Sequence, residues 1–184
     1  MNEEKVVLHE DDLRRSLRRI AHEVAERNHD CEAVGLVGIH RRGAVLARRL
    51  KEILDTMLTV EVPFGDLDIG FYRDDVASRA RAPVLHASHI DFDVNGKTIV
   101  IVDDVLYTGR TARAAIEALF DYGRPQRVQL AVLADRGHRE LPIRPDYVGK
   151  NLPTARDERV HVRVVEIDGV DEVAIGPAAV EAQV

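Results

Sequence analysis

The segment of this 184-residue sequence best suited to chemistry is an apolar run that ends in two adjacent carboxylates, Asp103 and Asp104. The loop that follows carries Thr108, Gly109 and Thr111, and a helical pattern begins there. Ligands of open α/β sheets bind beyond the carboxyl ends of strands, and the free N–H groups of a helix N-terminus suit a phosphate. Because two carboxylates would repel a phosphate, their natural partners are ribose hydroxyls or a Mg²⁺ ion shared with the ligand.

A simpler interpretation of these residues stays open. A single aspartate in this position would as readily end a strand or cap a helix. The whole arrangement of two carboxylates, Thr-Gly and a second threonine favours ligand binding.

A second loop, over residues 38–43, is bounded by two glycines. Its spacing is that of a Walker A loop, but Ala44 and Val45 stand where lysine and serine or threonine are needed, which excludes an ATPase. Arg41 and Arg42 would neutralise an anionic ligand. Taken alone, the loop is better explained as two surface arginines in a tight turn.

The elements around these loops alternate between apolar runs and amphipathic stretches. The patterns predict helices over 11–28, 43–54 and 111–122, and strands over 33–39, 58–63, 68–72, 98–102, 128–134 and 160–167, the last at an edge. Continuous apolar character in the central strands predicts burial on both faces, as in a parallel sheet. We therefore expect a single α/β domain over residues 1–184.

The segment 99–111 resembles the signature of the type I phosphoribosyltransferases. The resemblance implies their fold, a mostly parallel central sheet flanked by helices with a small hood region, which we expect at about 134–151. It also implies that this segment holds the 5′-phosphate and ribose of phosphoribosyl pyrophosphate (PRPP), while the loop 38–43 embraces the pyrophosphate. The implied PRPP- and UMP-binding residues are Gly38, His40, Arg41, Arg42, Gly43, Asp103, Asp104, Leu106, Tyr107, Thr108, Gly109, Arg110 and Thr111.

Residues 103–111, 123–125 and 135–151 are similar, more narrowly, to a family of bifunctional pyrimidine-operon regulators. That resemblance implies UMP synthesis from uracil and PRPP with Mg²⁺, UMP-responsive binding of the pyr operon mRNA leader, and a homo-oligomer, a dimer or higher. Asp103, Asp104 and Arg41 are then the catalytic residues. Asp135 and Arg136 border uracil, Asp135 also touches the metal or its waters, and the loop 73–85 closes over PRPP.

The first predicted helix has a basic side. At about 100° per residue, the side opposite the apolar stripe carries Arg14, Arg15, Arg18, Arg19 and His22. Like charges four residues apart repel by roughly 0.2–0.5 kcal/mol per pair, and phosphate binding would explain the arrangement. A solvated face in an arginine-rich protein is the alternative. The resemblance favours RNA binding, with a second basic cluster: His138, Arg139, Arg144 and Lys150.

Composition limits the function classes. The net charge of −6 argues against indiscriminate nucleic-acid binding, and no apolar run approaches the ~20 residues needed to cross a bilayer. The acidic N-terminus lacks a signal-peptide core, and Cys31, the only cysteine, cannot form an intrachain disulfide, so we expect a cytoplasmic protein without a membrane partner. We expect neither zinc at His86 and His89 nor catalysis by Cys31.

Two rival functions remain at this stage. One is a salvage phosphoribosyltransferase that has no RNA activity or takes a purine base. The other is a UMP-sensing RNA-binding regulator with little catalysis.

Overall fold

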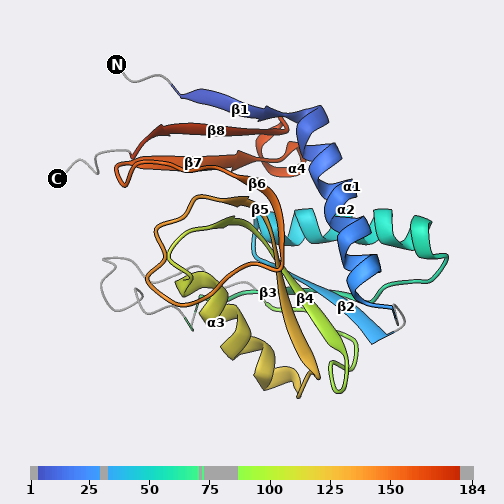
Figure 1. Cartoon of the computed structure of the whole chain (residues 1–184). Helices are drawn as coiled ribbons and strands as arrows, with labels where there is room; N and C mark the ends of the chain where they lie inside the picture. The colour runs from blue at the N-terminus through green and yellow to red at the C-terminus, as the bar shows by residue number, and fades with distance from the viewer. Residues whose placement is uncertain (1–3, 30–32, 71, 73–86, 179–184) are drawn as a thin grey trace.

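A five-stranded parallel sheet forms the centre of the structure, a computed structural model that describes residues 4–29, 33–70, 72 and 87–178 (Figure 1). The strand order is β3-β2-β4-β5-β6. The strands are β2 (Val34–Ile39), β3 (Phe64–Leu67), β4 (Thr98–Leu106), β5 (Arg127–Asp135) and β6 (Tyr147–Asn151). The predicted α/β class with a parallel sheet is confirmed.

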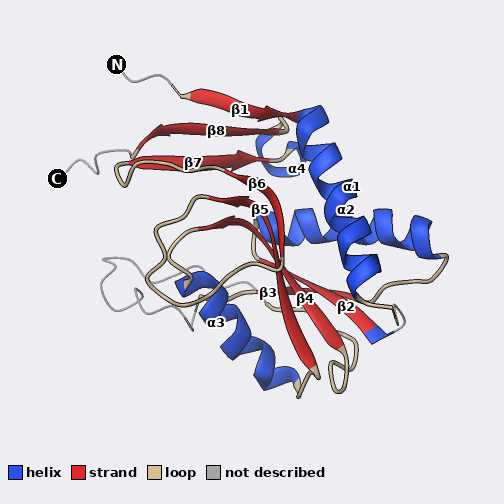
Figure 2. Cartoon of the chain, viewed as in Figure 1, coloured by secondary structure: helices blue, strands red, loops and turns tan. Residues whose placement is uncertain are grey.

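Helices cover both faces of this sheet (Figure 2). α1 (Glu10–Arg27) and α2 (Arg42–Leu58) lie on one face, and α3 (Arg110–Leu119), which ends in the 3₁₀ turn η3 (Phe120–Tyr122), lies on the other. Val100 and Val102 of β4 pack into the core beneath α1 and α2, whereas Ile99 and Ile101 pack into the core beneath α3. Burial on both faces explains the continuous apolar run of β4.

The apolar side of α1 was predicted correctly and fixes the orientation of the helix. Its buried residues are Leu13, Leu17, Ile20, Ala21 and Val24. Asp12 accepts a hydrogen bond from the backbone N–H of His9 through Oδ2 at 3.0 Å, which satisfies a donor at the helix start. Among the described residues, no helix is long and apolar enough to cross a membrane.

A second sheet joins the two ends of the chain and lies above the main sheet in Figure 1. It is antiparallel, in the order β1-β8-β7, and consists of β1 (Lys5–His9), β8 (Glu172–Pro177) and β7 (Glu158–Arg163). The short helix α4 (Val165–Asp168) connects β7 to β8. We call β1, β7, α4 and β8 the terminal subdomain. It was not predicted, because β1 and β8 come from opposite ends of the chain and no local pattern links them.

The structure corrects several predicted boundaries. Neither 58–63 nor 68–72 is a strand, and the observed strand β3 lies between them. The first segment is not a strand because α2 continues to Leu58. The second is not a strand because the chain turns there, where Asp68 Oδ1 accepts a hydrogen bond from the Gly70 N–H at 2.7 Å. The predicted strand 160–167 ends at Arg163, where the chain turns into α4. The segment 134–151 contains the unpredicted strand β6 of the main sheet.

Candidate active site and adjoining arginine surface

The two loops singled out in the sequence meet at one edge of the sheet. Gly38, near the end of β2, pairs with Val102 of β4, one residue before the acidic pair. On the other side of β4, Leu106 pairs with Asp135 at the end of β5. Because parallel strands end at the same edge, the loops 38–43 and 106–111 and residue 135 lie at one edge of the sheet, where ligands of such sheets bind.

Gly43 allows the first loop to lie directly against β4. A Cβ atom built on Gly43 would lie 2.5 Å from the carbonyl oxygen of Val102 and 3.1 Å from Cα of Asp103. No side chain fits this gap without displacing backbone. The glycine that closes the loop therefore sets the distance between the loop and the acidic pair.

The acidic pair is held by its own backbone. Asp103 is 7% exposed, and its Oδ1 accepts the N–H of Asp104 at 2.9 Å. Asp104 is half-buried, and its Oδ1 accepts the N–H of Val105 at 2.8 Å. These bonds restrict the two carboxylates, which can still accept hydrogen bonds from hydroxyl groups of a ligand at this edge of the sheet.

The loop after β4 forms a phosphate-sized cradle at the start of α3. Gly109, in the left-handed region at φ +93°, precedes the helix, and Thr108 Oγ1 accepts the N–H of Arg110 at 3.3 Å. The first-turn N–H groups of the ten-residue α3 lie at this loop. Such a helix end, with the hydroxyls of Thr108 and Thr111, suits a phosphate dianion.

The two arginines of the first loop have different surroundings. Arg41 is exposed, and the peptide bond that precedes it, from His40, is cis. Arg42 makes a two-pronged ion pair with Asp168 of α4, at 2.7 Å from Nη2 to Oδ1 and 3.2 Å from Nε to Oδ2. The Arg42 guanidinium also lowers the pKa of the Asp168 carboxyl. Arg42, predicted to neutralise the ligand, is thus engaged in an ion pair that nothing in the local sequence indicates.

Arg136, which was expected at the uracil site, is buried and donates hydrogen bonds to other residues of the protein. It is 6% exposed and donates to Thr154 Oγ1 at 3.1 Å and to the carbonyl oxygens of Ala155 at 3.1 Å and Glu158 at 2.7 Å. Its guanidinium stacks 4.0 Å from the ring centroid of Tyr107. This geometry favours a structural role over direct contact with the base or the pyrophosphate.

Asp135 is also engaged within the protein. Its Oδ2 accepts a hydrogen bond from Arg139 Nη2 at 2.5 Å, and its Oδ1 accepts the N–H of Gly137 at 3.0 Å. A cavity of about 470 Å³ opens beside it. The cavity is lined by Asp135, Arg136, Gly137, His138, Asn151, Pro153 and Thr154.

The segment after β5 is joined to the phosphate cradle by hydrogen bonds. The N–H groups of Glu140 and Leu141 both donate to the carbonyl oxygen of Thr108 at 3.0 Å. Arg139 donates to the carbonyl oxygen of Tyr107 at 2.7 Å. Arg139, predicted to contact RNA, therefore faces the protein more than the solvent.

The predicted basic face of α1 exists, but most of its charges are paired. Arg14 pairs with Asp11 and Arg15 pairs with Asp12, each at 2.6 Å. Both pairs are exposed, so they contribute little stability and can rearrange.

Arg19 links α1 to the main sheet. It bonds to Glu23 at 2.7 Å and to the carbonyl oxygens of Val148 and Gly149 in β6 at 2.9 and 2.6 Å. Lys150, one residue further along β6, is exposed. Arg18, His22 and Arg144 are exposed as well. α1 and β6 are thus joined by Arg19, and each carries exposed basic side chains.

Several predictions fall outside the described part of the chain: the closing loop 73–85, Cys31 and His86. Within the described part, no group of three or more His, Cys, Asp or Glu side chains is arranged to hold a metal ion. A metal ion bound by the described residues would therefore need further ligands from the substrate or from water.

The chain matches the family model described as "Phosphoribosyl transferase domain" over residues 9–166. Among curated proteins, it is 61% identical to the "Bifunctional protein PyrR" of a Roseiflexus species over 173 residues, 94% of each chain. It is 54% identical to the protein of the same name from Brevibacillus brevis over 175 residues, 95% of this chain and 98% of that one. The protein of that name from Deinococcus radiodurans is 54% identical over 92% of each chain.

Solved structures show the same architecture. A ternary substrates complex of hypoxanthine phosphoribosyltransferase from Trypanosoma cruzi superimposes with a TM-score of 0.75 at 19% identity, over 98% of each chain. Purine phosphoribosyltransferase from Pyrococcus horikoshii superimposes with a TM-score of 0.60 at 28% identity, over 79% of this chain and 85% of that one.

Proposed function

Because the chain belongs to the phosphoribosyl transferase domain family and, within it, to the PyrR proteins, we propose that it makes UMP from uracil and PRPP and binds pyrimidine-operon mRNA in response to UMP. The expected type I phosphoribosyltransferase fold is confirmed. The observation that best supports the proposal is the meeting of three features at one sheet edge: the glycine-bounded loop, the acidic pair and the phosphate cradle.

The phosphate cradle and the acidic pair hold the two ends of the ribose phosphate. Loop 106–111 and the start of α3 bind the 5′-phosphate through N–H groups and hydroxyls. Asp103 and Asp104 accept hydrogen bonds from the ribose hydroxyls, and their negative charge favours the positive charge that develops at C1′. The Gly38–Gly43 loop binds the diphosphate next to them, and the register of Gly38 with Val102 supports this assignment.

The reaction breaks the bond between C1′ and the diphosphate oxygen and forms a bond from C1′ to a ring nitrogen of uracil. The electron pair of the broken bond leaves with the diphosphate, and the proton of the attacking uracil N–H group is released to solvent. Arg41, exposed in the first loop, and the loop N–H groups stabilise that growing negative charge. Catalysis here is mainly the positioning of two reactants and the stabilisation of charge.

The cavity of about 470 Å³ beside Asp135 accepts the base. Arg136 and Asp135 shape its wall, and Asn151, a residue that the sequence did not single out, adds an amide at its rim. The amide can both donate to and accept from a pyrimidine edge.

Mg²⁺ enters this proposal with the substrate. Mg²⁺ keeps several waters and binds through one or two carboxylates together with substrate phosphates. Asp103 and Asp104 fit that requirement, whereas Asp135 fits it less well because Arg139 and Gly137 already engage its two oxygens. When bound, the ion neutralises part of the diphosphate charge.

The RNA-binding surface comprises the basic side of α1 together with Lys150, His138 and Arg144. The salt bridges from Arg14 and Arg15 to neighbouring acids hold these guanidinium groups outward at low cost. Phosphate groups of an RNA would compete for them. A protein that acts on a transcript works in the cytoplasm, and we expect a homo-oligomer, a dimer or higher.

Product formation from uracil tests the catalytic part of the proposal. We expect UMP and diphosphate from uracil, PRPP and Mg²⁺, and no nucleotide from hypoxanthine or guanine under the same conditions. Turnover of a purine instead would support the salvage alternative. A protein that binds UMP but forms none would support the regulator with little catalysis.

A further inference from the structure

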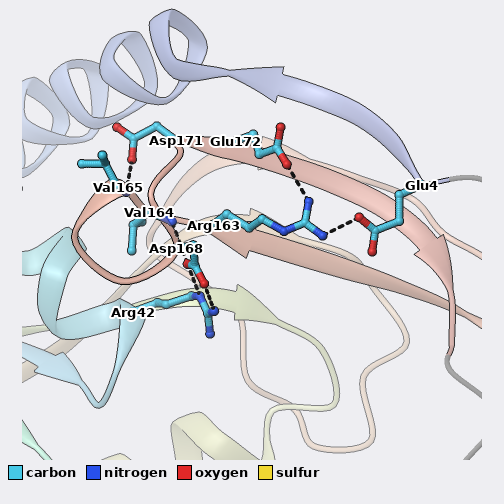
Figure 3. A network of polar contacts seen from close by, with 8 residues as sticks. All are labelled: Glu4, Arg42, Arg163, Val164, Val165, Asp168, Asp171 and Glu172. Atoms are coloured by element: carbon cyan, nitrogen blue, oxygen red, sulfur yellow. Dashed lines mark hydrogen bonds and ion pairs between the residues drawn. The ribbon is translucent and has the colours of Figure 1, made fainter.

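The terminal subdomain is fastened to α2 by two arginines on the same side of that helix. Arg42 and Arg49 are seven residues apart, which is close to two full turns of an α-helix. Arg42 pairs with Asp168, and Arg49 pairs with Glu166 and Asp171, so both arginines hold the α4 turn. Figure 3 shows the Arg42 end of this clamp below the β7–β8 sheet.

Asp168 has two tasks in this arrangement. Its Oδ2 accepts a hydrogen bond from the Val164 N–H at 3.0 Å, which fixes the start of α4. Both oxygens of the same carboxylate also accept hydrogen bonds from the Arg42 guanidinium (Figure 3). Its side chain is 19% exposed and that of Arg42 is 34% exposed. A partly buried, two-pronged pair of this kind has a more defined geometry than an exposed one.

Arg42 is the first residue of α2, and the Gly38–Gly43 loop leads into it. Holding Arg42 therefore holds the end of the loop that carries His40 and Arg41. Gly43, the next residue, is the point at which the loop touches β4. The Arg42–Asp168 pair thus connects the terminal subdomain to the end of the loop.

We propose that Asp168 is a positioning residue for the diphosphate-binding loop, acting through Arg42, so that the terminal subdomain sets the affinity for PRPP. This inference rests on the proposed function. It assigns Arg42 to the support of the loop rather than to direct contact with the diphosphate. A loop held in its binding shape loses less conformational freedom when the ligand binds.

The carboxylates on Arg49 provide a matched control. Glu166 and Asp171 also join the α4 turn to α2, but they do so through Arg49, which lies two helical turns away from the Gly38–Gly43 loop. Both clamps contribute to the docking of the terminal subdomain, whereas only the Arg42 pair adjoins the loop. Glu166→Gln and Asp168→Asn each remove one charge from α4.

The test compares PRPP and UMP as ligands of the two full-length variants. UMP has the 5′-phosphate and ribose but no diphosphate, so its affinity depends on the cradle at α3 and not on the first loop. For Asp168→Asn we expect the KM for PRPP to rise about tenfold, equivalent to ~1.4 kcal/mol, with kcat within about threefold of wild type. The Kd of UMP, measured by calorimetry, stays unchanged, and Glu166→Gln leaves both constants unchanged.

Three results would overturn the inference. An unchanged KM for PRPP in Asp168→Asn would show that the loop needs no support from α4. A lower KM would show that the released Arg42 binds the diphosphate itself. Equal weakening of PRPP and UMP would show a general loss of structure.

A second variant guards against a folding failure of Asp168→Asn. Arg42→Lys keeps the positive charge but loses the two-pronged geometry, and we expect the same selective rise in the KM for PRPP. Asp168→Glu, which keeps the carboxylate, should restore part of the affinity. A wild-type protein that does not use PRPP would instead contradict the proposed function, so the two failures are distinguishable.

Discussion

Gly43 of the first loop and Asp103 of β4 lie so close that a Cβ atom on the glycine would stand 3.1 Å from the aspartate Cα. This contact joins two segments that are distant in the sequence. It places the loop that we propose binds the diphosphate beside the carboxylate that we propose binds the ribose. The spacing between these two groups is therefore built into the backbone and does not depend on a flexible side chain.

Gly43→Ala should impair PRPP use without unfolding the protein. The added methyl group would lie 2.5 Å from the Val102 carbonyl oxygen and push the loop away from β4. A misplacement of a substrate-binding group by about 1 Å can lower the rate about 100-fold, so we expect kcat/KM for PRPP to fall roughly 10- to 100-fold. Steady-state kinetics measure the loss. Gly96→Asn, in an open turn at φ +70°, is the control and should leave kcat/KM unchanged.

Asp104→Asn should remove charge from the ribose site and leave the fold intact. The half-buried amide replaces the carboxylate with little change in volume, but it does not stabilise the charge that develops at C1′. We expect kcat/KM for PRPP to fall by roughly 100-fold, as for other groups that stabilise a transition state by charge. UMP formation gives the rate, and circular dichroism checks the fold. A rate near that of wild type would remove Asp104 from the catalytic assignment.

Substituting both Arg18 and His22 by alanine should weaken RNA binding and spare catalysis. Both side chains are exposed on α1 and lie one turn apart. We expect at least about a tenfold weaker Kd for RNA, and a salt dependence of log K that is less steep by about 0.7–0.9 per lost phosphate contact.

Arg113→Ala provides the control for that experiment. Arg113 is an exposed arginine on α3, paired with Glu117 and on the opposite face of the sheet from α1. It should leave RNA binding and UMP formation unchanged. Equal loss of RNA binding and catalysis in the Arg18/His22 variant would indicate a folding defect instead.

The sequence predicted the parts of the fold that rest on local periodicity. The burial of β4 on both faces and the apolar side of α1 follow directly from the residue pattern, and the helix-start cradle after β4 follows from Thr108 and Gly109. The meeting of the loops at one sheet edge follows from the rule for parallel strands.

The remainder depends on long-range contacts, which spacing does not encode. β1 pairs with β8, and nothing in the five residues Lys5–His9 indicates a partner near residue 174. Arg42 and Arg136 look like anion ligands in the sequence, but their partners come from other segments of the chain, α4 for Arg42 and the stretch between β6 and β7 for Arg136. An arginine is assigned to a ligand or to an ion pair only when its neighbours in space are known.

Acid should weaken the clamp between α2 and the terminal subdomain. The Arg42 guanidinium holds the pKa of Asp168 below its ordinary value of 3.8, and the Arg49 guanidinium holds that of Glu166 below 4.5. A carboxyl with a lowered folded-state pKa stabilises the fold fully above its unfolded pKa, and this contribution is lost as the pH falls through the folded-state pKa.

The melting temperature of wild type should therefore exceed that of Asp168→Asn at about pH 6, and the gap should narrow below about pH 4. Thermal unfolding followed by circular dichroism across this range measures the gap. A gap that stays constant as the pH falls would contradict the role of the ionised carboxylate.

Binding of the purified protein to the leader transcript of its own pyrimidine operon, with and without UMP at a stated salt concentration, tests the central claim most directly. The account predicts tight binding that UMP strengthens and that the Arg18/His22 double substitution weakens. Binding no tighter than to an unrelated RNA of equal length, with or without UMP, would contradict the regulatory half of the account and leave a salvage enzyme.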